Sequence, residues 1–326
     1  MPTKSYAFAV GNVRAKETTL LKKQDLEQML ALNSVLELAS FLKDKGFGFA
    51  DTAGDVDELL LAEEQKVWEY VAEIAPDFSV FEPFIISNDF HNLKAILKAT
   101  LSSVDYSELL LRPTLVDTAL LEKAVTEQKF SLLPPYMAQA AEKAYGALFK
   151  IGDSQLCDAV LDTAANTYKQ ERAATIKNPM LQNLLLATVF YDNVKAAIRL
   201  ARANKTADFC DMCLVNTTAV SKQRLKEAAL KGSGEVLNLL SNIAAFKASE
   251  AAESYKVSPG EFERFVDNYL MSVVLSAKYV AVGAEPIIAY LWAKLAEIKA
   301  CRIIKSGIAT GENTKKVREM LRELYG

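Results

Sequence analysis

The segment Asn92–Lys98 reads NLKAILK, and the pattern returns as NVKAAIR at Asn193–Arg199 and as EIKACRI at Glu297–Ile303. The three copies begin 101 and 104 residues apart, and an aromatic-rich segment precedes each of them. Similar helical units in one chain usually bury their apolar faces against neighbouring units. We therefore predict three helical repeat units in one body, which span residues 1–112, 113–215 and 216–326.

Helical periodicity extends outward from these copies over nearly the whole chain. Thirteen glycines and nine prolines are few for 326 residues, and helix interiors need neither residue. No run with strand-like alternation precedes an Asn-Gly or Asp-Gly turn. Capping residues and prolines mark where helices begin and end, among them Ser34, Gly46, Asp55, Pro76, Pro179 and Pro259. The predicted fold class is all-α.

Composition excludes several classes of protein. The chain is 51% hydrophobic and 24% charged, which fits a folded protein, and its net charge of −3 gives no general basic surface for nucleic acid. A single histidine, His91, cannot build a metal site with two histidines. Four cysteines are too few for a disulfide scaffold. We also expect no signal peptide and no transmembrane segment, because no apolar run is long enough.

Three features could suggest chemistry, and none has the pattern that chemistry requires. Asp89 and His91 are two residues apart, so a helix would not bring them face to face. The Cys210–Cys213 CxxC motif lacks the further ligands that zinc needs. The Gly307–Asn313 segment lacks the Gly-Lys-Ser/Thr ending of a phosphate loop. We expect no catalytic, cofactor or metal site.

Charge is unevenly distributed along the chain. The segment Asp51–Glu82 has ten acidic residues against one lysine, and we expect it to be a solvated surface. Basic residues form a stripe at helical spacing in the first two repeat copies: Lys94, Lys98, Lys195, Arg199 and Arg202. Like charges four residues apart repel each other, so the stripe either faces something acidic or is merely solvated.

The element Asp89–Lys94, DFHNLK, is the most specific of several motifs in a characteristic order. The others are Tyr6, Asn12–Ala15, Gly152–Asp153, Asp158–Asp162, Arg302–Ile304, Gly307 and Val317–Tyr325. Together they resemble the C subunit of the bacterial and archaeal V/A-type ATPases, whose equivalent in the eukaryotic vacuolar enzyme is the d subunit.

This resemblance implies a funnel of three helical bundles related by a pseudo-threefold axis. It also implies a non-catalytic central-stalk protein that couples the central shaft to the proteolipid rotor ring during ATP-linked proton or sodium transport. One copy per complex would lie on the cytoplasmic face of the membrane, without membrane insertion, nucleic acid or cofactor. Candidate interface or family-motif residues are Arg14, Asp89, His91, Asn92, Lys94, Lys98, Asn193, Lys195, Arg199, Arg202, Arg302, Arg318 and Arg322.

Two other functions remain open from the sequence. A helical-repeat scaffold for soluble partners would have the same periodicity and repeats. An all-α enzyme is a third class, although the chain lacks the arrangements typical of acid–base, nucleophilic and metal catalysis.

Overall fold

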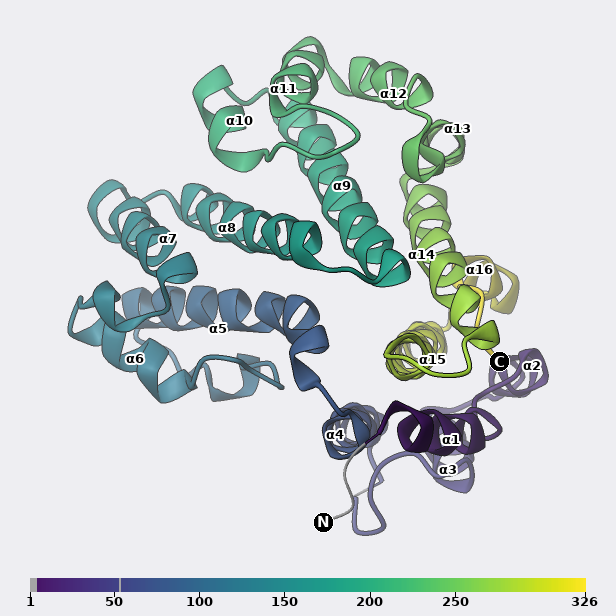
Figure 1. The fold of residues 1–326 in the computed structure, drawn as a ribbon. Helices are drawn as coiled ribbons and strands as arrows, with labels where there is room; N and C mark the ends of the chain where they lie inside the picture. The colour runs from purple at the N-terminus through teal and green to yellow at the C-terminus, as the bar shows by residue number, and fades with distance from the viewer. Residues whose placement is uncertain (1–4, 53) are drawn as a thin grey trace. The chain divides into compact units, whose positions relative to one another are not determined.

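The computed structural model describes residues 5–52 and 54–326, and within these ranges it contains helices and no strands (Figure 1). The predicted all-α fold class is therefore confirmed. The chain forms two compact units, one of which is Phe81–Glu253 and the other the two flanking parts of the chain. The three predicted repeat units stay a prediction, since these two units are defined by packing and not by repetition.

The first unit joins the N-terminal residues up to Val80 to the segment Ser254–Gly326. Its helices are α1 (Tyr6–Glu17), α2 (Lys23–Leu30), α3 (Val35–Asp44), α4 (Val56–Ile74), α14 (Pro259–Leu275), the 3-10 helix η6 (Ser276–Tyr279), α15 (Glu285–Thr310) and α16 (Thr314–Met320). The 26-residue α15 packs against α1, α4 and α14 and is the central element of the unit.

The second unit is continuous in sequence. Its helices are α5 (Glu82–Ser102), η2 (Ser107–Leu109), α6 (Thr118–Thr126), η3 (Phe130–Leu132), α7 (Pro135–Tyr145), the π-helix η4 (Gly146–Ile151), α8 (Ser154–Thr175), α9 (Pro179–Arg202), α10 (Ala207–Cys213), α11 (Lys222–Lys231), α12 (Ser233–Ser241) and η5 (Ala245–Lys247). In Figure 1, α8 lies between α5 and α9, and it packs against both. Two elements, η1 (Phe78–Phe81) and α13 (Ala248–Val257), span the points where the chain passes between units.

The predicted helix limits follow from local chemistry. The hydroxyl of Ser34 accepts a hydrogen bond from the backbone N–H of Glu37 and caps α3, and Gly46 follows that helix with a φ of +77°. This left-handed conformation favours glycine, which has no Cβ. Pro179 and Pro259 open α9 and α14, where a missing N–H costs nothing. These predicted helix ends are confirmed.

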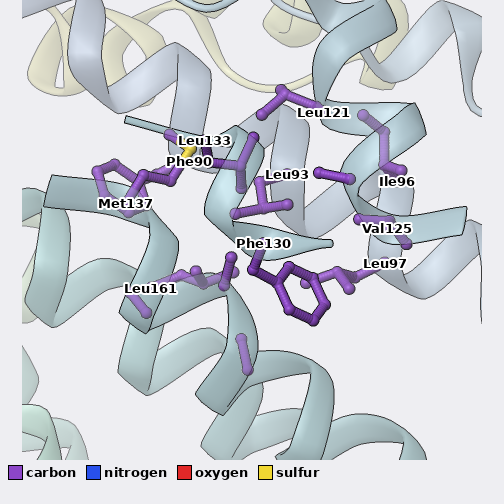
Figure 2. Packing of buried hydrophobic residues seen from close by; sticks show 14 of the residues in the cluster. Phe90, Leu93, Ile96, Leu97, Leu121, Val125, Phe130, Leu133, Met137 and Leu161 are labelled. Atoms are coloured by element: carbon purple, nitrogen blue, oxygen red, sulfur yellow. The ribbon is translucent and has the colours of Figure 1, made fainter. Parts of the chain in front are cut away.

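A continuous apolar core fills the first half of the second unit (Figure 2). Phe90, Leu93 and Leu97 lie on one face of α5, as the sequence predicts, and all three are buried. Figure 2 shows them packed with Phe130 and Met137 from η3 and α7. Burial of each such side chain stabilises the fold by about 1.5–3 kcal/mol.

A separate core holds the first unit together. Most of its buried members come from α2, α3, α4, α15 and α16, and they include Met29, Leu42, Leu60, Ile304 and Val317. Because the N-terminal and C-terminal helices share this core, both ends of the chain contribute to the stability of one unit.

Truncation of α5 on its two faces should have very different effects. We expect Leu93→Ala to lower the free energy of unfolding by about 2–5 kcal/mol, because it leaves a cavity at a fully buried position. The matched control, Leu101→Ala, changes a leucine of the same helix that is 50% exposed and should cost less than about 1 kcal/mol. Urea unfolding of both variants measures the difference. Equal losses would contradict the assigned face.

Candidate functional site

The first position of each repeat copy is a buried polar residue that binds backbone. Asn92, Asn193 and Glu297 are at most 2% exposed on α5, α9 and α15. Their side-chain oxygens accept hydrogen bonds from the backbone N–H groups of Leu111, Val215 and Leu21, at 2.8, 3.0 and 2.5 Å respectively. Each long helix therefore fixes a non-helical segment that crosses it, and this gives those N–H groups a partner in an apolar region.

The two asparagines also donate. The amide Nδ2 of Asn92 lies 3.0 Å from the carbonyl oxygen of Leu111, and that of Asn193 lies 2.8 Å from that of Val215. A side-chain amide satisfies the N–H and the C=O of one residue simultaneously, as a neighbouring β-strand would. Both residues were candidate interface or family-motif residues, and the structure places them inside the protein.

Asp89 and His91 bind the segment that follows α5, as Asn92 does. Asp89 is fully buried, and its Oδ1 accepts hydrogen bonds from the backbone N–H groups of Leu115 and Val116 at 3.0 and 3.3 Å. The His91 Nε2 lies 3.1 Å from the carbonyl oxygen of Leu109. The DFHNLK element therefore holds the segment after α5, and Asp89 and His91 each bind backbone groups of that segment.

Burial governs the ionisation of Asp89. It raises the pKa of this carboxyl group to about 6, and the two backbone N–H donors reduce the rise without cancelling it. The charged form of Asp89 is therefore costly in the folded protein at neutral pH.

Lys94 and Lys98 find their acidic partners within the chain. Their Nζ atoms lie 2.6 and 2.8 Å from carboxylate oxygens of Asp162 and Asp158 on α8. Both pairs are partly exposed, so each contributes roughly 0–1 kcal/mol to stability. The acidic surface opposite the first copy of the basic stripe is thus α8 of the same unit.

The acidic segment 51–82 faces α15 in the same manner. Arg302 binds Glu64 with 3.0 Å between Nη2 and Oε2, and Lys305 binds Asp57 with 2.5 Å between Nζ and Oδ2. The side chain of Asp57 is 64% exposed and that of Glu64 is 27% exposed, so both acids remain at the surface that the sequence predicts, although they pair with α15. A sequence alone does not show which helix lies opposite, so the complementary charges could not be matched.

Glu63 departs from that prediction, because it lies in a buried ionic cluster at 3% exposure. Lys294 Nζ lies 2.7 Å from Glu63 Oε1 and 2.8 Å from Glu297 Oε2, and Lys66 Nζ lies 2.6 Å from Glu63 Oε2. Burial alone would raise the pKa of Glu63, but Lys294 and Lys66 outweigh it and hold that pKa below its ordinary value. Removal of one member of such a cluster leaves an uncompensated buried charge.

Arg14 joins α1 to the end of η6, two parts of the first unit that are far apart in sequence. Its Nη1 binds both carboxylate oxygens of Glu17 at 2.8 Å, and its Nη2 binds the carbonyl oxygen of Ala277 at 2.8 Å. The carbonyl oxygens of Lys278 and Val280 accept from the same Nη2 at 3.1 Å. A planar guanidinium group with five donors suits this cluster of carbonyls at the end of η6.

Arg318 and Arg322 hold the C-terminal segment in place. Arg318 pairs with Glu27 of α2, and the Nε of Arg322 lies 2.8 Å from Asp267 Oδ2 on α14. Lys299 of α15 binds the same Asp267 oxygen. Four of the candidate arginines (Arg14, Arg302, Arg318 and Arg322) therefore make ion pairs inside the first unit.

The remaining candidates lie together on α9. Arg199 and Arg202 are exposed, and Lys195 is half-buried. Lys195 and Arg199 line a cavity of about 240 Å³ between α5, α8, α9 and α10. Lys169 of α8, which is only 8% exposed, lines the same cavity.

Sequence reasoning missed Lys169 and Lys294 as buried cations. One feature of the sequence could have indicated the ion pair of Lys294. It precedes Glu297, the first residue of the third repeat copy, by three residues, which is a spacing at which side chains on a helix form ion pairs. Lys169 had none, because it lies in a polar stretch where a solvated lysine is the ordinary expectation.

The two thiols of the CxxC motif are unreactive in their surroundings. Burial raises the pKa of the Cys213 thiol to about 12, and it also raises that of Cys210. Reactive cysteines have lowered pKa values and a thiolate, so these two side chains act as small apolar residues on α10.

Among the residues that the structure describes, no cluster of histidine, cysteine or carboxylate side chains could hold a metal ion. In the same part of the chain, no helix is long and apolar enough to cross a membrane.

Asp89 should give the protein a measurable pH dependence. Its pKa is about 6 in the folded state and roughly 3.9 when unfolded, so the folded state binds more protons between these values. Stability therefore falls as pH rises through this range, by about 3 kcal/mol in total.

Comparison with Asp89→Asn isolates this contribution, because all other groups are common to both proteins. We expect the unfolding free energy of the variant to gain about 3 kcal/mol relative to wild type between pH 4 and pH 7, measured by urea titration at each pH. Parallel pH profiles for the two proteins would contradict the assignment.

Comparison with known proteins identifies the family. The family model described as ATP synthase (C/AC39) subunit matches residues 9–320. The chain is 21% identical to the C subunit of the V-type sodium ATPase of Enterococcus hirae, over 96% of this chain and 97% of that protein. It is 27% identical to the C subunit of the A-type ATP synthase of Methanobrevibacter smithii, over 97% and 88%. The chain therefore belongs to the ATP synthase (C/AC39) subunit family, whose members are non-catalytic stalk proteins of V-type and A-type ATPase complexes.

Proposed function

We propose that this chain is a central-stalk protein that couples the central shaft of a rotary ATPase to its membrane rotor ring. In this role it transmits torque between ATP chemistry in other subunits and the transport of protons or sodium ions. One copy lies on the cytoplasmic face of the membrane, bound to the ring and without insertion into the lipid.

The observation that carries the proposal is the extent of the family match. It covers residues 9–320, and the two ATPase relatives align with nearly the whole chain. An adapter that merely shared a helical repeat with this family would be expected to match over part of its length.

The internal construction is suited to the transmission of force. The longest helices, α5, α8, α9 and α15, have between 21 and 26 residues. Buried side chains of α5, α9 and α15 bind neighbouring segments, and partly exposed ion pairs join α8 to α5. Close-packed interiors have low compressibility and transmit strain. A coupling element needs this stiffness, whereas a flexible scaffold does not.

Binding to isolated rotor rings tests the proposal directly. Rings purified from the ATPase of the same organism are captured on a surface, and the full chain is passed over them. We expect saturable binding at one chain per ring, and no binding of a heat-denatured sample of the same chain. Binding to soluble proteins of the cell without binding to the ring or the shaft would contradict the proposal and favour the scaffold.

Charge reversal on α9 tests whether the basic stripe contributes to assembly. We expect the triple variant Lys195→Glu, Arg199→Glu, Arg202→Glu to bind ATPase complexes stripped of this chain about tenfold or more weakly at low salt. The difference should shrink as salt rises, because ions screen exposed charges.

The control changes net charge by the same amount at three exposed lysines of the same unit: Lys143, Lys150 and Lys177. It should assemble as wild type does. If the α9 variant and the control show the same affinity and the same salt dependence, the stripe has no role in docking.

A further inference from the structure

One cavity of the second unit contains a buried cation whose charge is not matched by contact with an acid. The cavity has a volume of about 240 Å³, and Lys169, Lys195 and Arg199 line it together with Asp162 and Asp192. All these residues come from the adjacent helices α8 and α9 of one unit.

Lys169 is the unusual member. It is 92% buried, and across residues 5–52 and 54–326 no hydrogen bond or ion pair joins its ammonium group to another residue. Burial lowers the pKa of Lys169, while Asp192 and Asp162 oppose that shift from beyond ion-pair distance. The Nζ atom of Lys169 is not among the fully enclosed polar atoms that lack a hydrogen-bond partner, so the ammonium group is accessible from the cavity that it lines. No contact within the described residues accounts for its position there.

The charge balance of the cavity favours an anion. Asp162 is already bound by Lys94, whose Nζ lies 2.6 Å from its Oδ1. Asp192 then lies in the lining with the two cations Lys169 and Arg199. A second carboxylate in the cavity would bring the local charge closer to neutrality and give Lys169 a partner.

Size and lining narrow the class of anion. Pockets for drug-sized ligands or cofactors measure roughly 300–1,000 Å³, so about 240 Å³ is too small for a nucleotide and sufficient for one side chain. Phe90, Ala165 and Ala196 contribute apolar wall beside the charged groups. A glutamate side chain has the same two parts, a carboxylate and a methylene stem.

We propose that this cavity receives the carboxylate of an acidic side chain from a partner protein in the ATPase complex, and that Lys169 is the residue that binds it. The identity of the partner as a component of the ATPase rests on the proposed function above. The chemistry of the cavity, a buried lysine that binds a protein carboxylate, does not.

The test compares Lys169→Met with Lys143→Met, an exposed lysine of α7 in the same unit. Methionine keeps the length of the side chain and removes its charge. We expect Lys169→Met to be as stable as wild type or more so in urea unfolding. A marked loss of stability would overturn the proposal, because Lys169 would then be a structural residue.

Two binding measurements complete the test. In one, the full chain is titrated calorimetrically with a blocked tetraglutamate peptide and, separately, with inorganic phosphate. In the other, it is added to ATPase complexes stripped of this chain. We expect Lys169→Met to weaken peptide binding and assembly at least tenfold, and Lys143→Met to change neither.

The outcomes separate the two proposals. Unchanged peptide binding and assembly by Lys169→Met would overturn the carboxylate site, and so would Lys169-dependent binding of phosphate without binding of the peptide. If wild type does not join the stripped complex, the proposed function fails. Lys169-dependent binding of the peptide would then still support the cavity as a carboxylate site.

Discussion

Hydrogen bonds from buried polar side chains to the backbone fix the segments that cross three of the long helices. On three long helices, Asn92, Asn193 and Glu297 stand in the core and accept a backbone N–H from a crossing segment. The contacts of the two asparagines fix the segments that follow α5 and α9. The contact of Glu297 fixes the segment before α2. Leucine at these positions would pack as well, but it would leave that N–H without a partner.

Charge acts between helices in a second way. The basic residues of α5 pair with acids of α8. Basic residues of α15 pair with acids of α4, and Glu63 and Lys294 form the buried centre of this second set. Isolated surface pairs add little stability. Networks that link long helices over several turns restrict how those helices can slide or rotate. A stalk protein of a rotary ATPase requires this kind of internal rigidity.

The sequence predicted features that depend on neighbours in the chain. Ser34 and Gly46 bound α3 as expected, and the apolar face of α5 around Leu93 is buried. The sequence could not predict the contacts between side chains of helices that are far apart in the chain. Lys94 could be assigned an acidic partner but not Asp162, which is 68 residues away in sequence. The burial of Lys169 could not be predicted, since it results from the packing of α8 against α9.

The most direct test of the account is electron cryomicroscopy of the ATPase purified through an affinity tag on this chain. If the chain couples shaft and ring, the map will contain one copy of it, with both units in density between the foot of the shaft and the membrane ring. A map that places the chain on the outer stalk or the catalytic head, or that lacks it, would contradict the account.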